Sequence, residues 1–95
     1  MTHVPYNEIV GQVYAHSDEV RRAFKKKGFI YQFDIQVSPN QYAIDPKFLA
    51  ESRDCQRWSV FHYKIGDETR GILQYMALYG FTDLQDAVFA RLIAE

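Results

Sequence analysis

The chain of 95 residues has very little cysteine and no long apolar run. Its single cysteine, Cys55, excludes an intramolecular disulfide and a metal site built from cysteines. No apolar run reaches the roughly 18 residues of a transmembrane helix, and the N-terminal MTHVPYNEIV lacks the charged and apolar regions of a signal peptide. These features predict a cytoplasmic protein that does not enter a membrane.

Residue patterns of known catalytic and ligand sites are also missing. The sequence has no glycine-rich phosphate loop, no nucleophile elbow and no HxxxH spacing. Cys55 and His62 could form a nucleophile–base pair, but their odd separation would place them on opposite faces of one strand. We therefore expect no enzyme, no metal and no cofactor, and the remaining catalytic alternative is an enzyme that uses Cys55 or His62.

The residues that are abundant indicate a small globular domain with surplus aromatic rings. Hydrophobic residues make up 47% of the chain and charged residues 24%, and this length predicts one domain spanning 1–95. Aromatic residues make up 16%, more than a core of this size needs, so we expect some rings at the surface. The net charge of −1 argues against a protein that covers nucleic acid with its whole surface.

The first third of the chain carries a helical pattern that ends in lysines. Apolar steps of three and four predict helix between residues 5 and 27, as one helix or as two with a break at His16. Residues 25–27 are all lysine and precede Gly28, and such an arrangement is typical of a helix C-terminus. From Phe29 to Val37 apolar residues fall on every second position, which predicts a half-buried strand.

The remainder of the chain alternates between turn, strand and helix signals. We expect a turn at 38–40, a short strand at 42–44, a short helix at 46–52, a strand at 57–65 and two helices at 67–79 and 82–95. The first of the two last helices is apolar nearly all round, which predicts a central buried helix. The second is expected to begin with a capping box formed by Thr82 and Gln85. Its inward residues are expected to be Leu84, Val88, Leu92 and Ile93.

Together these segments predict an α+β fold. It would consist of an N-terminal helix or helix pair, a small mostly antiparallel sheet of two or three strands, and a C-terminal αα-hairpin.

The stretch KGFIYQF resembles the third-strand signature of the RNA-recognition motif. Lys27, Gly28, Phe29 and Tyr31 match that pattern, whereas Asp34 stands where the last aromatic residue belongs. That family begins with a strand, whereas a long helical pattern comes first in this chain. A platform on which RNA bases stack also needs open rings with basic neighbours. We therefore interpret KGFIYQF as a helix end followed by a core strand.

The expected C-terminal helix pair has the order of a DNA-binding helix-turn-helix. Its second helix would carry Asp83 and Asp86 toward the DNA, with Arg91 as its one basic residue. Because carboxylates repel phosphates, we expect a packed αα-hairpin instead.

Protein binding is the function that these exclusions leave. The leading hypothesis is a small non-catalytic inhibitor, adaptor or accessory subunit, of the kind that phages and mobile elements use to block a host machine. The candidate contacts for an acidic partner surface are Arg21, Arg22, Lys25 and Lys26. The candidate contacts for an apolar surface are Trp58, Tyr75 and Tyr79.

Tyr75 and Tyr79 would lie one turn apart on the expected helix, so a homodimer or the groove of a partner would cover both. The alternative function is nucleic-acid binding through the basic helix 18–27.

Overall fold

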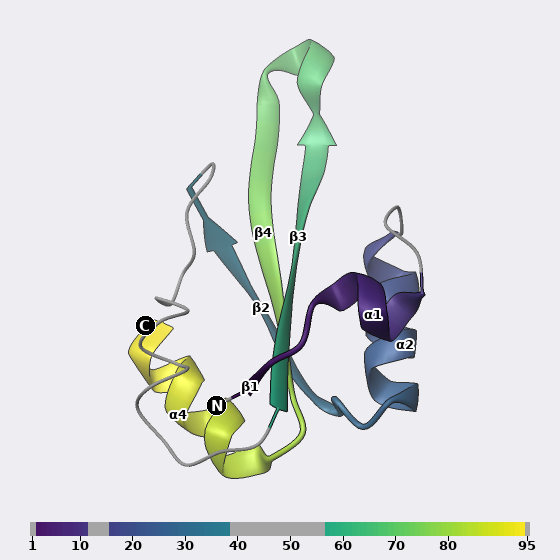
Figure 1. Ribbon diagram of the computed structural model, residues 1–95. Coiled ribbons are helices and arrows are strands. Elements are labelled where there is room, and N and C mark those ends of the chain that lie inside the picture. The colour runs from purple at the N-terminus through teal and green to yellow at the C-terminus, as the bar shows by residue number, and fades with distance from the viewer. Residues whose placement is uncertain (1, 12–15, 39–56, 95) are drawn as a thin grey trace.

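The computed structural model describes residues 2–11, 16–38 and 57–94, which form a sheet with helices on both faces (Figure 1). The strands are β1 (Thr2–His3), β2 (Tyr31–Val37), β3 (Arg57–Asp67) and β4 (Ile72–Phe81). The helices are α1 (Tyr6–Val10), α2 (Ser17–Lys26) and α4 (Leu84–Ala94), and a short 3-10 helix, η1 (Glu68–Arg70), connects β3 to β4. The strand order is β1-β3-β4-β2, in which only β1 runs parallel to its neighbour.

This arrangement confirms the α+β class, the small mostly antiparallel sheet and the C-terminal helix. β1, of which the sequence pattern gives no sign, adds a fourth strand to the sheet. None of the helices in the described part of the chain is long and apolar enough to cross a bilayer.

The N-terminal helical region is divided into two helices. Gly11 closes α1 with a left-handed φ of 84°, and its N–H donates to the carbonyl of Asn7 at 2.8 Å. This conformation favours glycine and ends the helix. α2 then begins at Ser17, after His16 in an extended conformation. Of the two alternatives, two helices is therefore the correct one.

The segment KGFIYQF is a helix end that leads into a strand, as interpreted from the sequence. α2 ends at Lys26, Gly28 adopts a φ of 96°, and the N–H of Phe29 donates to the carbonyl of Phe24 at 2.7 Å. The position of Phe29 differs from the expected alternation, which put Phe29 on the same face as Tyr31. Phe29 instead packs against Phe24, on the opposite face of the sheet.

The expected helix at 67–79 is wrong, because residues 72–81 form the central strand β4. β4 lies between β3 and β2, and its second half, from Ala77 to Phe81, is buried on both faces. A strand that is buried on both sides has no polar face, so it reads as a continuous apolar run and resembles a buried helix. The C-terminal αα-hairpin is therefore a strand followed by one helix, and the helix-turn-helix reading loses its first helix.

The sheet separates two small cores. On the face covered by α4, here called the α4 face, the buried cluster contains Trp58, Val60, Ala77, Tyr79, Phe81, Ala87 and Ala90. On the face covered by α1 and α2, here called the α2 face, it contains Ile9, Val20, Phe24, Phe29, Phe61 and Leu78. The alternation expected for the strand at 57–65 is confirmed, since Trp58 and Val60 face α4 whereas Phe61 faces α2.

The orientation expected for the last helix is also wrong. Ala87 and Ala90 of α4 are buried against the sheet, whereas the four residues expected to point inward are exposed. Those four residues are Leu84, Val88, Leu92 and Ile93. The α4 face already carries the large rings of Trp58, Tyr79 and Phe81, so small alanines let the helix approach the sheet closely.

The start of α4 differs from the expected capping box. The side chain of Asp83 accepts the N–H of Asp86 at 3.1 Å, so Asp83 occupies the capping role. Thr82 instead bonds across the sheet end, where its hydroxyl contacts both the N–H and the carbonyl of Arg57 at 3.2 Å. The expected strand at 42–44, the expected helix at 46–52 and Cys55 lie outside the described residues, as do residues 39 and 40 of the turn expected at 38–40.

Candidate interaction surfaces

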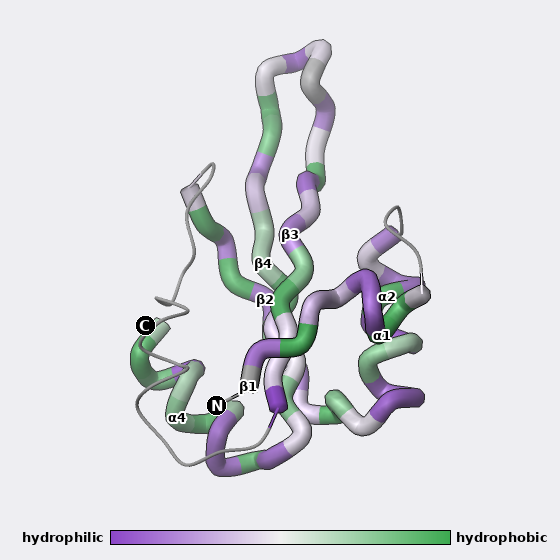
Figure 2. The backbone as a smooth tube through the Cα atoms, in the orientation of Figure 1, coloured by the Kyte–Doolittle hydropathy of each residue, from purple (hydrophilic) through white to green (hydrophobic). Residues whose placement is uncertain are grey.

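An apolar stripe on α4 borders a groove along the edge of the sheet. Leu84, Val88 and Leu92 are 54%, 51% and 67% exposed, and Ile30 beside them is 51% exposed. The tube in Figure 2 is hydrophobic along most of α4. With Tyr31, Gln32, Phe33, Ala87 and Arg91, these four residues line a groove of about 430 Å³. A patch of this kind marks a candidate site for a partner.

The groove follows the edge strand rather than only one sheet face. β2 stands last in the strand order, so among the described strands it pairs only with β4. Tyr31 and Phe33 belong to the α4 face, whereas Gln32 lies between them and points to the opposite face. Three consecutive residues of the edge strand therefore line the groove.

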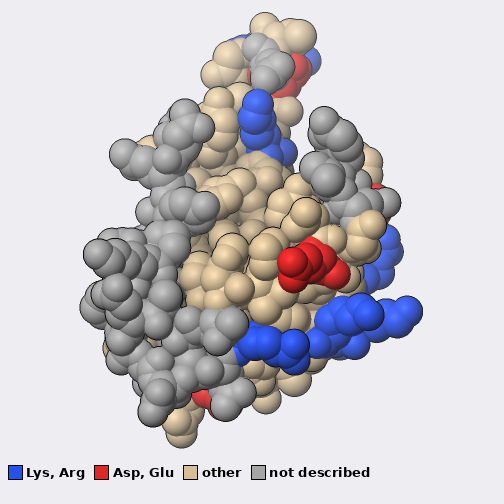
Figure 3. Space-filling model, in the orientation of Figure 1, with Lys and Arg blue, Asp and Glu red and all other residues tan. Residues whose placement is uncertain are grey.

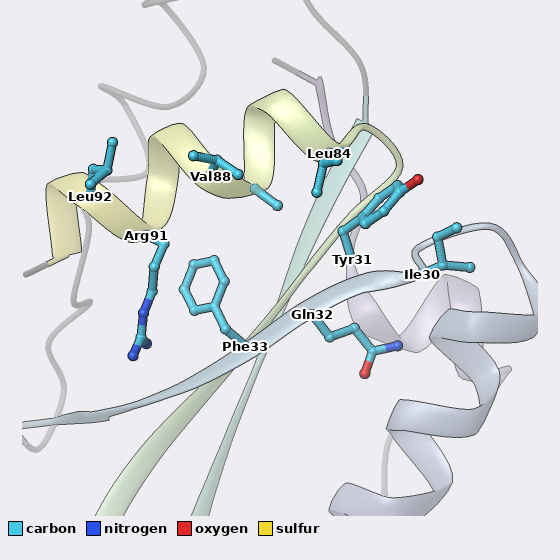
Figure 4. A pocket seen from close by; sticks show the side chains of 9 residues that line it. Ile30, Tyr31, Gln32, Phe33, Leu84, Val88, Arg91 and Leu92 are labelled. Atoms are coloured by element: carbon cyan, nitrogen blue, oxygen red, sulfur yellow. The ribbon is translucent and has the colours of Figure 1, made fainter.

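Figure 4 shows α4 and β2 running in the same direction along the groove. Arg91 extends from α4 toward β2, and its guanidinium carbon lies 5.5 Å from the centre of the Phe33 ring. A guanidinium at this distance from an aromatic ring is held by a cation–π interaction. Arg91 is the only charged residue among the nine that line the groove.

A polar network joins α2 to the α2 face of the sheet. Asp34 accepts hydrogen bonds from Arg21 and from the hydroxyl of Tyr63, and a second bond of 3.1 Å joins Arg21 to Tyr63. Arg21 also contacts Asp18 at 3.2 Å. Partial burial lowers the pKa of the Arg21 guanidinium, but the bonds and charges of Asp34 and Tyr63 outweigh that effect and raise it. Arg21 is thus a structural residue that ties α2 to β2 and β3.

Tyr63 shares this network and is perturbed by it. Partial burial raises the pKa of its hydroxyl, and the hydrogen bond and negative charge of Asp34 raise it further, against the opposing charge of Arg21. The network holds β2 and β3 together on the α2 face. The groove lies on the side of β2 that α4 covers.

Basic side chains gather at the end of α2. Lys25, Lys26 and Lys27 are exposed, and Arg57 joins them because its guanidinium carbon lies 5.8 Å from the ring of Phe29, next to the helix end. Figure 3 shows Lys and Arg side chains over α2 and near the start of β3. Among the described residues no ion-pair partner is recorded for these four. They form a basic cluster. Nothing in the residues next to Arg57 indicates that it belongs to this cluster.

The aromatic residues expected at an apolar interface lie mostly in the core. Trp58 is 1% exposed and Tyr79 is 0% exposed, and both pack beneath α4. Tyr75 is half-buried on the same strand as Tyr79, with the ammonium of Lys64 5.7 Å from its ring. Because β4 is a strand, Tyr75 and Tyr79 are not one helical turn apart. Of the basic candidates, Arg22, Lys25 and Lys26 are exposed on α2, whereas Arg21 belongs to the network with Asp34.

The tip of the β3–β4 hairpin, which extends beyond the helices in Figure 1, is ordered by its own side chains. Asp67 accepts the N–H of Thr69 at 3.0 Å and its hydroxyl at 2.6 Å, and these bonds lower the pKa of Asp67. Arg70 pairs with Asp67 at 3.4 Å. Ile65 and Ile72 are exposed on this arm, so it forms a second, smaller apolar surface.

His3 and His62 lie in the described part of the chain, whereas Cys55 lies outside it. Burial lowers the pKa of both His3 and His62, and His3 packs against the Trp58 ring with centroids 4.6 Å apart. In the described ranges no three histidine, cysteine or acidic side chains come together as a possible metal site.

Sequence reasoning identified the stripe residues but assigned them to the core. The sequence shows that these residues are four positions apart, but it does not show which side of the helix faces the core. The signal for the correct orientation is the pair of small residues, Ala87 and Ala90, on the other side of the helix. No protein-family model, curated protein or solved structure matches this chain, so the fold and its side chains alone carry the functional argument.

Proposed function

We propose that the protein is a non-catalytic protein-binding module, acting as an inhibitor, adaptor or accessory subunit, whose contact surface is the groove between α4 and β2. The single observation that carries this proposal is the exposed stripe of Leu84, Val88 and Leu92 on a helix that turns its alanines to the core. Large apolar side chains in a contiguous exposed patch favour an interface.

The size of the stripe indicates what a partner has to supply. Fully burying a large apolar side chain contributes roughly 1.5–3 kcal/mol. Ile30, Leu84, Val88 and Leu92 are each half or more exposed, so covering all four contributes about 3–7 kcal/mol by the same measure. Association itself costs about 4–15 kcal/mol. The stripe alone therefore does not hold a stable complex, and the partner has to make polar contacts as well.

The test compares capture by the wild-type chain and by Val88→Glu, which places a carboxylate in the stripe. Each is immobilised and exposed to lysate with and without nuclease, and bound proteins are identified by mass spectrometry. We expect a stoichiometric partner that survives nuclease and is lost from Val88→Glu. The partner is then purified and its affinity for both chains measured.

Gln85→Glu is the matched control, because Gln85 is exposed on the same helix and does not line the groove. It adds the same charge, so it should leave capture unchanged. Circular dichroism of both variants checks that the fold is retained. If no captured protein distinguishes Val88→Glu from Gln85→Glu, the proposed function is wrong.

A second candidate function rests on the basic cluster. Lys25, Lys26, Lys27 and Arg57 come from two separate segments and have no recorded ion-pair partner among the described residues. An anionic polymer would find a preformed surface there. Nucleic acid bound in this way has an affinity that falls steeply with salt, with a slope of about −0.9 per phosphate contact.

Fluorescence polarisation with labelled single-stranded and double-stranded oligonucleotides tests this candidate. Arg57→Glu and the triple change of residues 25–27 to glutamate should each remove binding, whereas Val88→Glu should not. Binding that is weak and insensitive to these charges would eliminate the nucleic-acid candidate.

A further inference from the structure

We infer that the groove takes an extended segment of the partner as an additional strand beside β2, with two apolar side chains under α4 and an acidic residue at Arg91. This inference rests on the proposed function, because it specifies how the partner occupies that surface.

The backbone of β2 provides the polar contacts that the stripe lacks. β2 is seven residues long and pairs with β4 on one side among the described strands. The groove touches Tyr31, Gln32 and Phe33, which are consecutive residues of this edge strand, so it lies beside the backbone of β2. An extended peptide that adds to such an edge gains affinity from main-chain hydrogen bonds and specificity from its alternate side chains.

The spacing of the stripe fits a strand. Leu84, Val88 and Leu92 are four residues apart, which is about 6 Å along a helix at 1.5 Å per residue. Alternate side chains of a strand are about 6.8 Å apart. Since α4 and β2 run in the same direction (Figure 4), residues i and i+2 of an added strand would meet successive residues of the stripe.

The charge and volume of the groove define the occupant further. Arg91 is the only charged residue among the lining residues and lies over Phe33 at one end, so a carboxylate complements that end. A volume of about 430 Å³ lies in the lower part of the range of small-ligand sites and admits a few side chains.

A second copy of this chain fits the edge less well. Asp34 is the middle residue of β2, so symmetric antiparallel pairing of two β2 strands about their midpoints would set two Asp34 residues opposite each other. Like charges directly opposite are destabilising. A helix in the groove would leave the edge of β2 unpaired. An extended acidic–apolar segment uses the edge, the stripe and Arg91 together.

The test is a selection of displayed random 12-residue peptides on the immobilised wild-type chain, with removal of peptides that also bind Val88→Glu. We expect selected peptides to carry apolar residues at i and i+2 and an acid on one side. For a synthetic selected peptide, Arg91→Gln should weaken binding about tenfold, and replacing the acid of the peptide should make that change ineffective. Gln85→Glu serves as the control variant.

Methylation of single backbone nitrogens in the peptide tests strand pairing directly. We expect losses above tenfold at alternate positions and little change between them, since only alternate N–H groups face β2. Selected peptides with an apolar period of three to four residues and no such alternation would overturn the inference and leave the proposed function standing. A selection that yields no peptide dependent on Val88 would also overturn it.

Two further outcomes separate this inference from the function on which it rests. Sedimentation that shows a dimer of the wild-type chain and a monomer of Val88→Glu would identify a second copy as the occupant and refute the inference. If lysate capture also fails to distinguish Val88→Glu from Gln85→Glu, the inference and the proposed function fail together.

Discussion

The orientation of α4 predicts a small loss of stability for a change at Leu92 and a larger loss for a change at Ala90. Leu92 is 67% exposed, so about a third of its side chain is buried. With roughly 1.5–3 kcal/mol for a fully buried leucine, Leu92→Ala should lower the free energy of unfolding by about 0.5–1 kcal/mol. The sequence pattern alone, with Leu92 in the core, implies a loss of about 2–5 kcal/mol.

Ala90→Leu is the opposite perturbation on the same helix. Ala90 is 0% exposed and packs in the cluster that contains Trp58 and Tyr79. A leucine there forces extra methylene groups into a filled core, which costs about 1–3 kcal/mol. The sequence pattern places position 90 outside the inward set and implies almost no loss.

Urea unfolding measures both changes. Trp58 is buried, so its fluorescence reports the loss of the α4 face, and far-ultraviolet circular dichroism reports the helices. The dependence of the unfolding free energy on urea should stay constant across the variants. Gln85→Ala, on the exposed part of α4, is the control and should change stability by less than about 0.5 kcal/mol. A loss above 2 kcal/mol for Leu92→Ala, with none for Ala90→Leu, would refute the reasoning.

Three other residues give independent predictions. A Cβ on Gly80 would lie 2.5 Å from the Phe24 ring, so Gly80→Ala should lower the free energy of unfolding in urea by about 1–3 kcal/mol. When Phe24→Leu is added, the double variant should lose less stability than the sum of the two single losses. Asp83→Ala removes the cap of α4 and should cost about 1 kcal/mol, whereas Asp83→Asn should retain most of it; equal losses would argue against capping. The raised pKa of Tyr63 means that the protonated hydroxyl stabilises the fold below about pH 10, and that this stability is lost as pH rises through the folded pKa. Unfolding measured from pH 8 to 11 should therefore show the advantage of wild type over Tyr63→Phe shrinking, and a constant difference would exclude the effect.

The local elements that depend on neighbouring residues could be predicted from the sequence. The end of α2 follows from cations before a glycine, and the strand predicted at 57–65 follows from alternation with period two, because each signal is contained in a few consecutive residues. The candidate surfaces could not be predicted in the same way. Arg57 lies near the end of α2 only because β3 starts beside Phe29.

The sequence by itself determined the α+β class, the two strands flanking the middle of the sheet and the C-terminus of α2, since propensity, capping and periodicity act over one or two turns. Tertiary structure alone decided that residues 72–81 are a strand, because burial on both faces removes the alternation that marks a strand in sequence. It also decided which side of α4 faces the core. The aromatic rings of the sheet leave room for alanines there, and the leucines and valine of the same helix are consequently exposed beside β2, the edge strand of the described sheet.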